Sequence, residues 1–308
     1  MIALGSPAPW PEENFPGWRS GCLPQRFSAI LPAHARQPRA SRVVRRLLAP
    51  ALVVIAVFAA ALFALLRYSV LEFVPGSLQP GGLTLANFTG ILSRQYLGAV
   101  WDTLVLSAAT TVLTLVASYP VAYTLARTRS ARVRSAILVL TLAPFFTGAI
   151  ARTYAWVLVL GNTVVTWPVP LLFTPRGVLV GLVHFSMPTM ILLLAAAISH
   201  IDPVYERAAV SLGAGPGRVF WRVTLPLSRP GIVSGSVIVF AWTLSAFATP
   251  ELLGGGKVKM IANVVRDLAL DSFNWPGGAA FAVLALVVTF ALLAGVGRLT
   301  AAGEGGAR

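Results

Sequence analysis

The sequence has 308 residues, of which 56% are apolar and only 11% are charged, and its formal net charge is +14. A soluble domain carries roughly a quarter charged residues, so we expect lipid rather than water around much of this chain. The basic residues lie between apolar blocks without aromatic residues interleaved, a distribution that argues against nucleic-acid binding. One cysteine, Cys22, and three scattered histidines exclude an intramolecular disulfide and make a cysteine or histidine metal site unexpected.

The sequence predicts an all-α membrane protein with six transmembrane helices. A span needs about 20 mostly apolar residues, because each residue adds about 1.5 Å across a hydrocarbon core about 30 Å thick. Between the spans lie turn residues such as Gly161-Asn162, and Leu83–Arg94 is a candidate short helix or re-entrant segment. The six predicted spans are Leu47–Leu66, Thr103–Ala126, Ser135–Leu160, Gly177–Ile201, Pro230–Pro250 and Gly278–Gly297.

The arginines between the spans predict the orientation of the chain. Cytoplasmic loops are enriched in Lys and Arg, and the richest segments lie on the same side as both termini. These segments contain Arg127, Arg129, Arg132, Arg134, Arg207, Arg218, Arg222 and Arg229, besides the arginines of the N-terminal region. We therefore expect residues 1–44 to be a disordered basic cytoplasmic tail, residues 45–297 the six-helix domain, and residues 298–308 a cytoplasmic C-terminal tail.

Between the fourth and fifth spans, the chain has the local signals of a helix–turn–helix. Asp202 is a good N-cap, and Glu206 favours the positive N-terminal end of a helix dipole. Gly213 is a natural C-terminal stop, because a left-handed conformation costs little without a Cβ. Pro216 can open a second short helix, which is expected to end at the Leu225-Pro226 break.

This segment resembles the EAA motif of binding-protein-dependent ABC importer permeases. That motif reads Glu-Ala-Ala, three residues, Gly, nine residues, an aliphatic residue, one residue and Leu-Pro. Ala208-Ala209, Gly213, Val223 and Leu225-Pro226 match this spacing. The departure is Arg207, which stands in the glutamate position, while Glu206 comes one residue earlier.

The resemblance extends over roughly residues 45–297 and implies the type I ABC importer permease fold. Within the family, Arg152–Trp156, Pro250–Gly255 and Asn274-Trp275-Pro276 resemble the spermidine/putrescine-type permeases. The resemblance implies that residues 202–226, the coupling loop, dock on an ABC ATPase subunit through Glu206, Arg207, Ala208, Ala209, Gly213, Leu225 and Pro226.

No phosphate-binding loop is present in the sequence, since Gly254-Gly255-Gly256-Lys257 lacks the spacing and is followed by Val258. We expect no cofactor on this chain, with ATP and Mg bound by the partner ATPase. The other expected partners are a second homologous permease, an extracytoplasmic solute-binding protein and the lipid bilayer. The expected location is the bacterial inner membrane, with a role in transport and not as an enzyme.

Charged and aromatic residues near the ends of the spans are candidates for the substrate pathway, because charges at membrane depth are costly. The resemblance to spermidine/putrescine-type permeases favours a polyamine as cargo, whose ammonium groups carboxylates and aromatic faces would suit through ion pairs and cation–π contacts. Iron(III), thiamine or an opine-like solute are alternative cargoes, and a self-sufficient secondary transporter or channel is an alternative class. The candidate pathway residues are Arg152, Tyr154, Trp156, Glu251, Asp267, Asp271 and Trp275.

Small residues predict where helices approach closely. Gly177-x-x-x-Gly181 and Gly231-x-x-x-Gly235 have the spacing that places both glycines on one helix face. We therefore expect tight helix packing at both positions.

Overall fold

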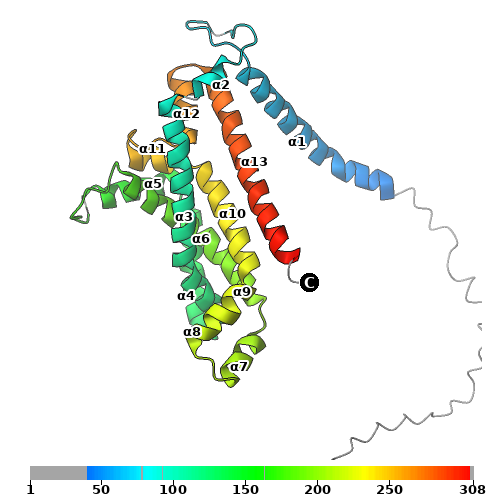
Figure 1. Ribbon diagram of the computed structural model, residues 1–308, viewed down its shortest axis with the longest axis vertical. Helices are drawn as coiled ribbons and strands as arrows, with labels where there is room; N and C mark the ends of the chain where they lie inside the picture. The colour runs from blue at the N-terminus through cyan, green and yellow to red at the C-terminus, as the bar shows by residue number, and fades with distance from the viewer. Residues whose placement is uncertain (1–39, 78, 92, 163, 306–308) are drawn as a thin grey trace, which may run out of the picture. The chain divides into compact units, whose positions relative to one another are not determined.

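The computed structural model describes residues 40–77, 79–91, 93–162 and 164–305. Within these ranges every regular element is a helix, and one isolated antiparallel bridge joins Leu71 and Leu83. In chain order (Figure 1) the elements are α1 (Ala40–Ser69), α2 (Ala86–Ile91), α3 (Arg94–Arg127), α4 (Ala131–Leu142), the 3-10 turn η1 (Ala143–Phe146), α5 (Ala149–Leu160), α6 (Pro175–Ser199), α7 (Pro203–Ser211), α8 (Pro216–Val219), the π-helical η2 (Phe220–Thr224), α9 (Leu225–Leu227), α10 (Arg229–Leu244), α11 (Ala248–Gly254), α12 (Ile261–Arg266), the π-helical η3 (Asp267–Asp271) and α13 (Trp275–Gly305).

Two compact units make up the chain, Met1–Ala59 and Ala60–Arg308, and the boundary falls inside α1. The predicted N-terminal tail, residues 1–44, lies outside the described residues except for its last five, which belong to α1. At the other end, residues 298–305 continue α13 as helix, so the described part of the predicted C-terminal tail is an extension of the last span.

In the part of the chain that the structure describes, four helical stretches are long and apolar enough to cross a membrane, namely Pro50–Ser69, Arg94–Arg127, Pro175–Ser199 and Trp275–Leu292. Two more crossings are possible only as bent pairs. Ala131–Phe146 meets Ala149–Leu160 at 104°, and Pro216–Leu227 meets Arg229–Leu244 at 66°. The six predicted spans correspond to these four helices and two bent pairs.

The third predicted span, Ser135–Leu160, is wrong as a single continuous helix. It breaks between η1 and α5, where Thr147 and Gly148 are both extended. Pro144 explains why α4 ends at Leu142, ahead of this break, since it has no N–H to continue the α-helical ladder and lies instead in the first turn of η1.

The fifth predicted span, Pro230–Pro250, ends earlier than expected, at Leu244. A separate helix, α11, then begins at Ala248. Because Pro250 has no N–H, a helix continuing through it would lose a backbone bond, whereas the first turn of a new helix needs none there. Because the helix restarts at Ala248, Pro250 lies in its first turn, where the missing N–H leaves no backbone carbonyl of the helix without a donor.

One of three hydrophobic core clusters in residues 60–308 lies where α3, α6 and α10 pack together. Met190 of α6 is fully buried and Val239 of α10 nearly so. A Cβ on Gly231 would collide with Ala197 of α6, and one on Gly235 would meet the Met190 sulfur at 2.8 Å. The close approach predicted for this glycine pair is confirmed, and it sets the spacing between α10 and α6.

The bundle carries different elements at its two ends. Figure 1 shows α7, α8 and α9 gathered at one end, which we call the coupling-loop end, and α2 and α12 at the opposite end. At the opposite end Tyr96 and Phe281 pack edge to face, with ring centroids 5.3 Å apart. The short helix expected within Leu83–Arg94 is present there as α2.

Candidate functional site

The first helix of the coupling loop begins and ends as its sequence predicts. Oδ1 of Asp202 accepts a hydrogen bond from the backbone N–H of Val204 at 2.8 Å, and Pro203 occupies the first helical position. After α7 ends, Gly213 adopts φ = +81°, the left-handed region that favours glycine. The N-cap and the glycine stop are both confirmed.

The second half of the loop differs from the prediction. Backbone N–H of Leu225 donates to the carbonyl of Phe220, a π-type bond five residues back. Pro226 has no N–H to offer the carbonyl of Arg222, which accounts for the widened turn at this point. The chain stays helical through Leu227 and bends at Ser228, so the predicted break at Leu225-Pro226 is wrong.

Glu206 points into the protein and joins three parts of the chain. Its Oε1 lies 3.0 Å from Nη2 of Arg127, at the end of α3, and accepts a 3.0 Å hydrogen bond from Oγ1 of Thr224 in η2. Tyr123 adds a 3.5 Å bond to Oε2, and Arg127 also donates to the carbonyl of Ile201 at 2.9 Å. Since the Glu206 and Arg127 side chains are only 14% and 15% exposed, water screens this pair weakly.

Sequence reasoning missed Arg127 and Thr224 as partners of Glu206. Arg127 is 79 residues away in the sequence. It was considered only as one of the arginines that predict the orientation of the chain, without a role of its own. One signal was available, because Glu206 and Asp202 are the only acidic residues of the coupling loop, and Asp202 is used as a cap. An acid in that position needs a basic partner when it is half-buried.

The other residues predicted for coupling lie on the opposite, exposed side of the loop or beneath it. Arg207, Ala208 and Gly213 are exposed, whereas Ala209 is half-buried. Leu225 and Pro226 are also half-buried, and Leu225 packs against the core shared by α3, α6 and α10. The loop therefore has an inner side that holds it to the bundle and an outer side open to a partner.

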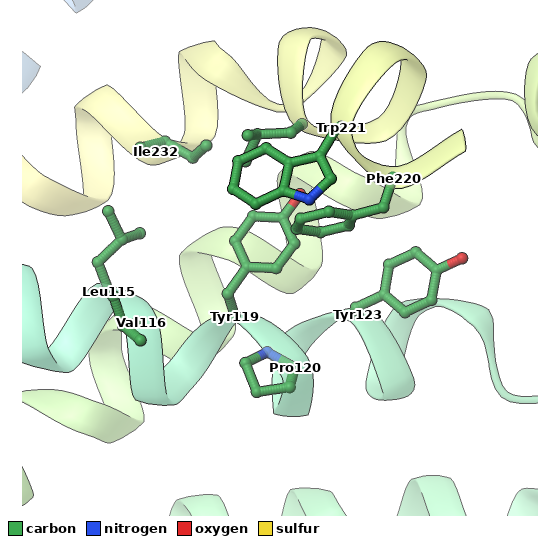
Figure 2. A pocket seen from close by; sticks show the side chains of 9 residues that line it. Leu115, Val116, Tyr119, Pro120, Tyr123, Phe220, Trp221 and Ile232 are labelled. Atoms are coloured by element: carbon green, nitrogen blue, oxygen red, sulfur yellow. The ribbon is translucent and has the colours of Figure 1, made fainter. Parts of the chain in front are cut away.

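An aromatic pocket lies directly beside the loop (Figure 2). It has a volume of about 460 Å³, and Figure 2 shows Phe220 and Trp221 of η2 next to Tyr119 of α3. Tyr119 and Phe220 pack edge to face with centroids 5.3 Å apart, and the Tyr119 hydroxyl is hydrogen-bonded to Ser228 at 2.8 Å. These contacts give η2 a second attachment to α3.

At the opposite end of the bundle, the three predicted carboxylates come together around one arginine. Nη1 of Arg266 lies 3.3 Å from Glu251, 3.0 Å from Asp267 and 3.2 Å from Asp271. Lys259 makes a further 2.6 Å ion pair with Asp267. Sequence reasoning named the three acids as pathway candidates but did not bring Glu251 together with the two aspartates, and it missed the two basic residues that neutralise most of their charge.

Arg152 and Trp156 contact the adjacent helix α6 and not the carboxylates. The Arg152 guanidinium carbon lies 3.8 Å from the centre of the Phe185 ring, and the Trp156 indole N–H donates to Nδ1 of His184 at 3.2 Å. Tyr154 is 57% exposed. Among the described acidic residues none forms an ion pair with Arg152.

Trp275 lies at a third place, the first residue of α13, where it lines a hollow with Leu65 and Ala269. The seven candidate pathway residues are therefore distributed over the α5–α6 contact, the Arg266 cluster and the start of α13. They do not form one site within this chain.

The fold is that of known ABC importer subunits. A chain in the crystal structure of a bacterial alginate ABC transporter, in complex with an alginate pentasaccharide-bound periplasmic protein, superposes with a TM-score of 0.72 at 17% identity. The match covers 85% of this chain and 95% of that one. A chain of the MetNI methionine ABC transporter in an inward-facing conformation gives a TM-score of 0.55 at 18% identity, covering 68% of this chain and 99% of that one.

Sequence relatives are closer. The spermidine/putrescine transport system permease protein PotB of Haemophilus influenzae is 35% identical over 222 residues, covering 68% of this chain and 77% of the relative. PotB of Escherichia coli strain K12 is 32% identical over 216 residues, covering 67% and 78%. The molybdenum transport system permease protein ModB of Mycobacterium tuberculosis is 35% identical over 203 residues, covering 64% and 77%.

Residues 118–301 match the family described as the binding-protein-dependent transport system inner membrane component. The matched region includes the whole coupling loop and all seven candidate pathway residues. The family match agrees with the helical fold, the apolar spans and the EAA spacing. The chain therefore belongs to this family of multi-pass inner-membrane proteins and is a permease subunit of an ABC importer, a transport subunit and not an enzyme.

Proposed function

We propose that this chain forms half of the translocation pathway for a polyamine such as spermidine or putrescine. A second homologous permease supplies the other half, an extracytoplasmic binding protein delivers the cargo, and ATP with Mg is bound by separate ATPase subunits. The observation that carries the proposal is the coupling loop, whose first helix is held to α3 through Glu206 and Arg127 while its other side is open. A helix fixed in this way can convert movement of an ATPase into movement of the spans.

In the proposed orientation both termini are cytoplasmic. The coupling-loop end, which carries Arg129, Arg207 and Arg218, then faces the cytoplasm, as the enrichment of arginine in inner loops favours. The opposite end, with α2, α12 and the Arg266 cluster, faces the binding protein.

Two observations support a polyamine as cargo. Relatives that are 35% and 32% identical to this chain are spermidine/putrescine permeases. In the Arg266 cluster, three carboxylates face two basic side chains and leave one formal negative charge in excess, which suits an ammonium group.

An oxyanion is the second candidate cargo. Its support is the similarity to a molybdenum permease and the guanidinium of Arg152, which no described carboxylate neutralises. The two candidates differ in charge, so one measurement separates them.

The test is calorimetric titration of the cognate binding protein with spermidine, putrescine and molybdate, followed by uptake into proteoliposomes containing the full transporter. Spermidine or putrescine binding with ATP-dependent uptake is the expected result. Tight binding of molybdate, or of a neutral solute, would overturn the polyamine proposal. Uptake without any ATPase subunit would overturn the importer mechanism itself.

A further inference from the structure

The exposed side of the coupling loop carries only positive charge that is free for a partner. Its basic residues Arg207, Arg218 and Arg222 are all exposed, and in the described part of the chain none of them forms an ion pair. The loop has two acidic residues, but Asp202 caps α7 and Glu206 is held inside by Arg127.

Next to these arginines lies a hollow with a volume of about 730 Å³. Arg127, Arg129 and Arg207 line it together with Glu206, and apolar side chains such as Phe220 form part of its wall. One carboxylate against three guanidinium groups leaves the hollow with a net positive charge, which raises the local concentration of acidic groups.

The loop also exposes large apolar side chains. Leu212 is 89% exposed, Tyr205 and Val210 are each 59% exposed, and Val204 is 50% exposed. Apolar side chains that cluster on a surface rimmed by charges mark an interface with another protein. The helix α7 lies at the extreme end of the bundle (Figure 1), next to which a partner can approach.

We propose that this surface binds an ATPase subunit whose docking groove is edged with carboxylates, so that charge complementarity selects the ATPase that this permease accepts. The inference rests on the proposed function and adds the chemistry of the partner. Arg207 stands where the EAA motif has a glutamate. A glutamate there would require a basic side chain in the groove, whereas Arg207 requires an acidic one. Opposed like charges at an interface are strongly unfavourable, which gives the contact its selectivity.

The experiment measures binding of the purified cognate ATPase to full-length permease complex in nanodiscs, at NaCl concentrations from low to high. The test variant is Arg207→Glu with Arg218→Glu. We expect affinity to fall about tenfold or more at low salt and the salt dependence to flatten or reverse, because steering by opposite charges is lost. Arg207→Gln should fall between the wild type and the reversed variant.

Arg176→Glu is the matched control, because it reverses an exposed charge in the first turn of α6 and should leave binding unchanged. Wild-type affinity and wild-type salt dependence in the doubly reversed variant would overturn the inference. An effect present in anionic phosphatidylglycerol nanodiscs and absent in phosphatidylcholine nanodiscs would assign the arginines to lipid headgroups and also overturn it. Failure of the wild-type complex to bind any ATPase would instead count against the proposed function.

Discussion

Single hydroxyl groups on α3 differ in what they contribute. Oγ1 of Thr103 accepts a 2.9 Å hydrogen bond from the backbone N–H of Ile261, 158 residues away, and so holds α12 to α3. Within the described residues the fully buried hydroxyls of Ser107, Thr110 and Thr114 have no partner. Burying a polar group without a hydrogen-bond partner is unfavourable, and removing the acceptor of a buried N–H adds that cost where the native protein avoids it.

The first prediction compares Thr103→Val with Thr110→Val. Thr103→Val leaves the N–H of Ile261 without its acceptor and should lower the free energy of unfolding by about 1–3 kcal/mol. Thr110→Val keeps the shape and removes an unpaired hydroxyl, so it should be neutral or stabilising. Thermal unfolding of the detergent-solubilised protein measures both, and equal losses would show that the Thr103 bond contributes nothing specific.

A second prediction concerns backbone conformation after α7. Gly213→Val places a branched side chain at φ = +81° and should cost about 1–3 kcal/mol locally, enough to distort the turn and reduce ATPase-coupled uptake. Gly215→Ala is the control, because Gly215 has an ordinary φ of −68° and open space where the Cβ would go. Uptake assays with both variants check this, and full activity of Gly213→Val would contradict it.

At the scale of helices, Glu206 acts as a positioning residue for α7. Glu206→Gln keeps the volume but weakens the bonds to Arg127 and Thr224. Because both partners of the ion pair are largely buried, stability should fall by about 2 kcal/mol. The ratio of ATP hydrolysed to cargo imported should rise as well, because α7 no longer moves with α3.

Arg129→Gln serves as the control for stability, since Arg129 is exposed and the described residues provide it with no ion pair. Measurement of ATPase activity and uptake in the same proteoliposomes separates loss of positioning from general unfolding. An unchanged ratio in Glu206→Gln would restrict its role to stability.

Local signals in the sequence predicted local structure well. Asp202 and Gly213 act within one or two residues of themselves, so their roles can be predicted from the local sequence. Hydropathy predicted where apolar segments occur. It contains no information about the N–H that Pro144 and Pro250 lack, and two of those segments are divided near these prolines. Contacts such as Glu206 with Arg127 depend on how α3 meets the coupling loop, and that is a property of the fold.

The candidate pathway residues illustrate the same limit. Asp267 and Asp271 lie close together in sequence, and the structure keeps them close. Arg152 and Trp156 are turned toward α6 by Phe185 and His184, partners that no motif indicated. Residue type identified candidates, whereas tertiary packing decided which of them meet.

For the whole molecule, the proposed orientation predicts accessibility from the two sides of the membrane. In a variant with Cys22→Ser, Ser211→Cys places a thiol at the exposed end of α7, and Ser272→Cys places one at the opposite end, beside Asp271. With the permease expressed without its ATPase, so that α7 is uncovered, a membrane-impermeant maleimide should label Ser272→Cys in intact spheroplasts, whereas Ser211→Cys should require permeabilised cells. The reverse pattern would invert the orientation.

Because Glu206 is attached to Arg127, a movement of α7 can tilt the whole of α3. α3 has 34 residues and at about 1.5 Å per residue is about 51 Å long. A tilt of about 5° imposed at the Arg127 end would displace its far end by about 4 Å, larger than the length of a hydrogen bond. Near that far end Thr103 holds Ile261, so a small rotation of α7 would shift α12, on the face proposed to meet the binding protein.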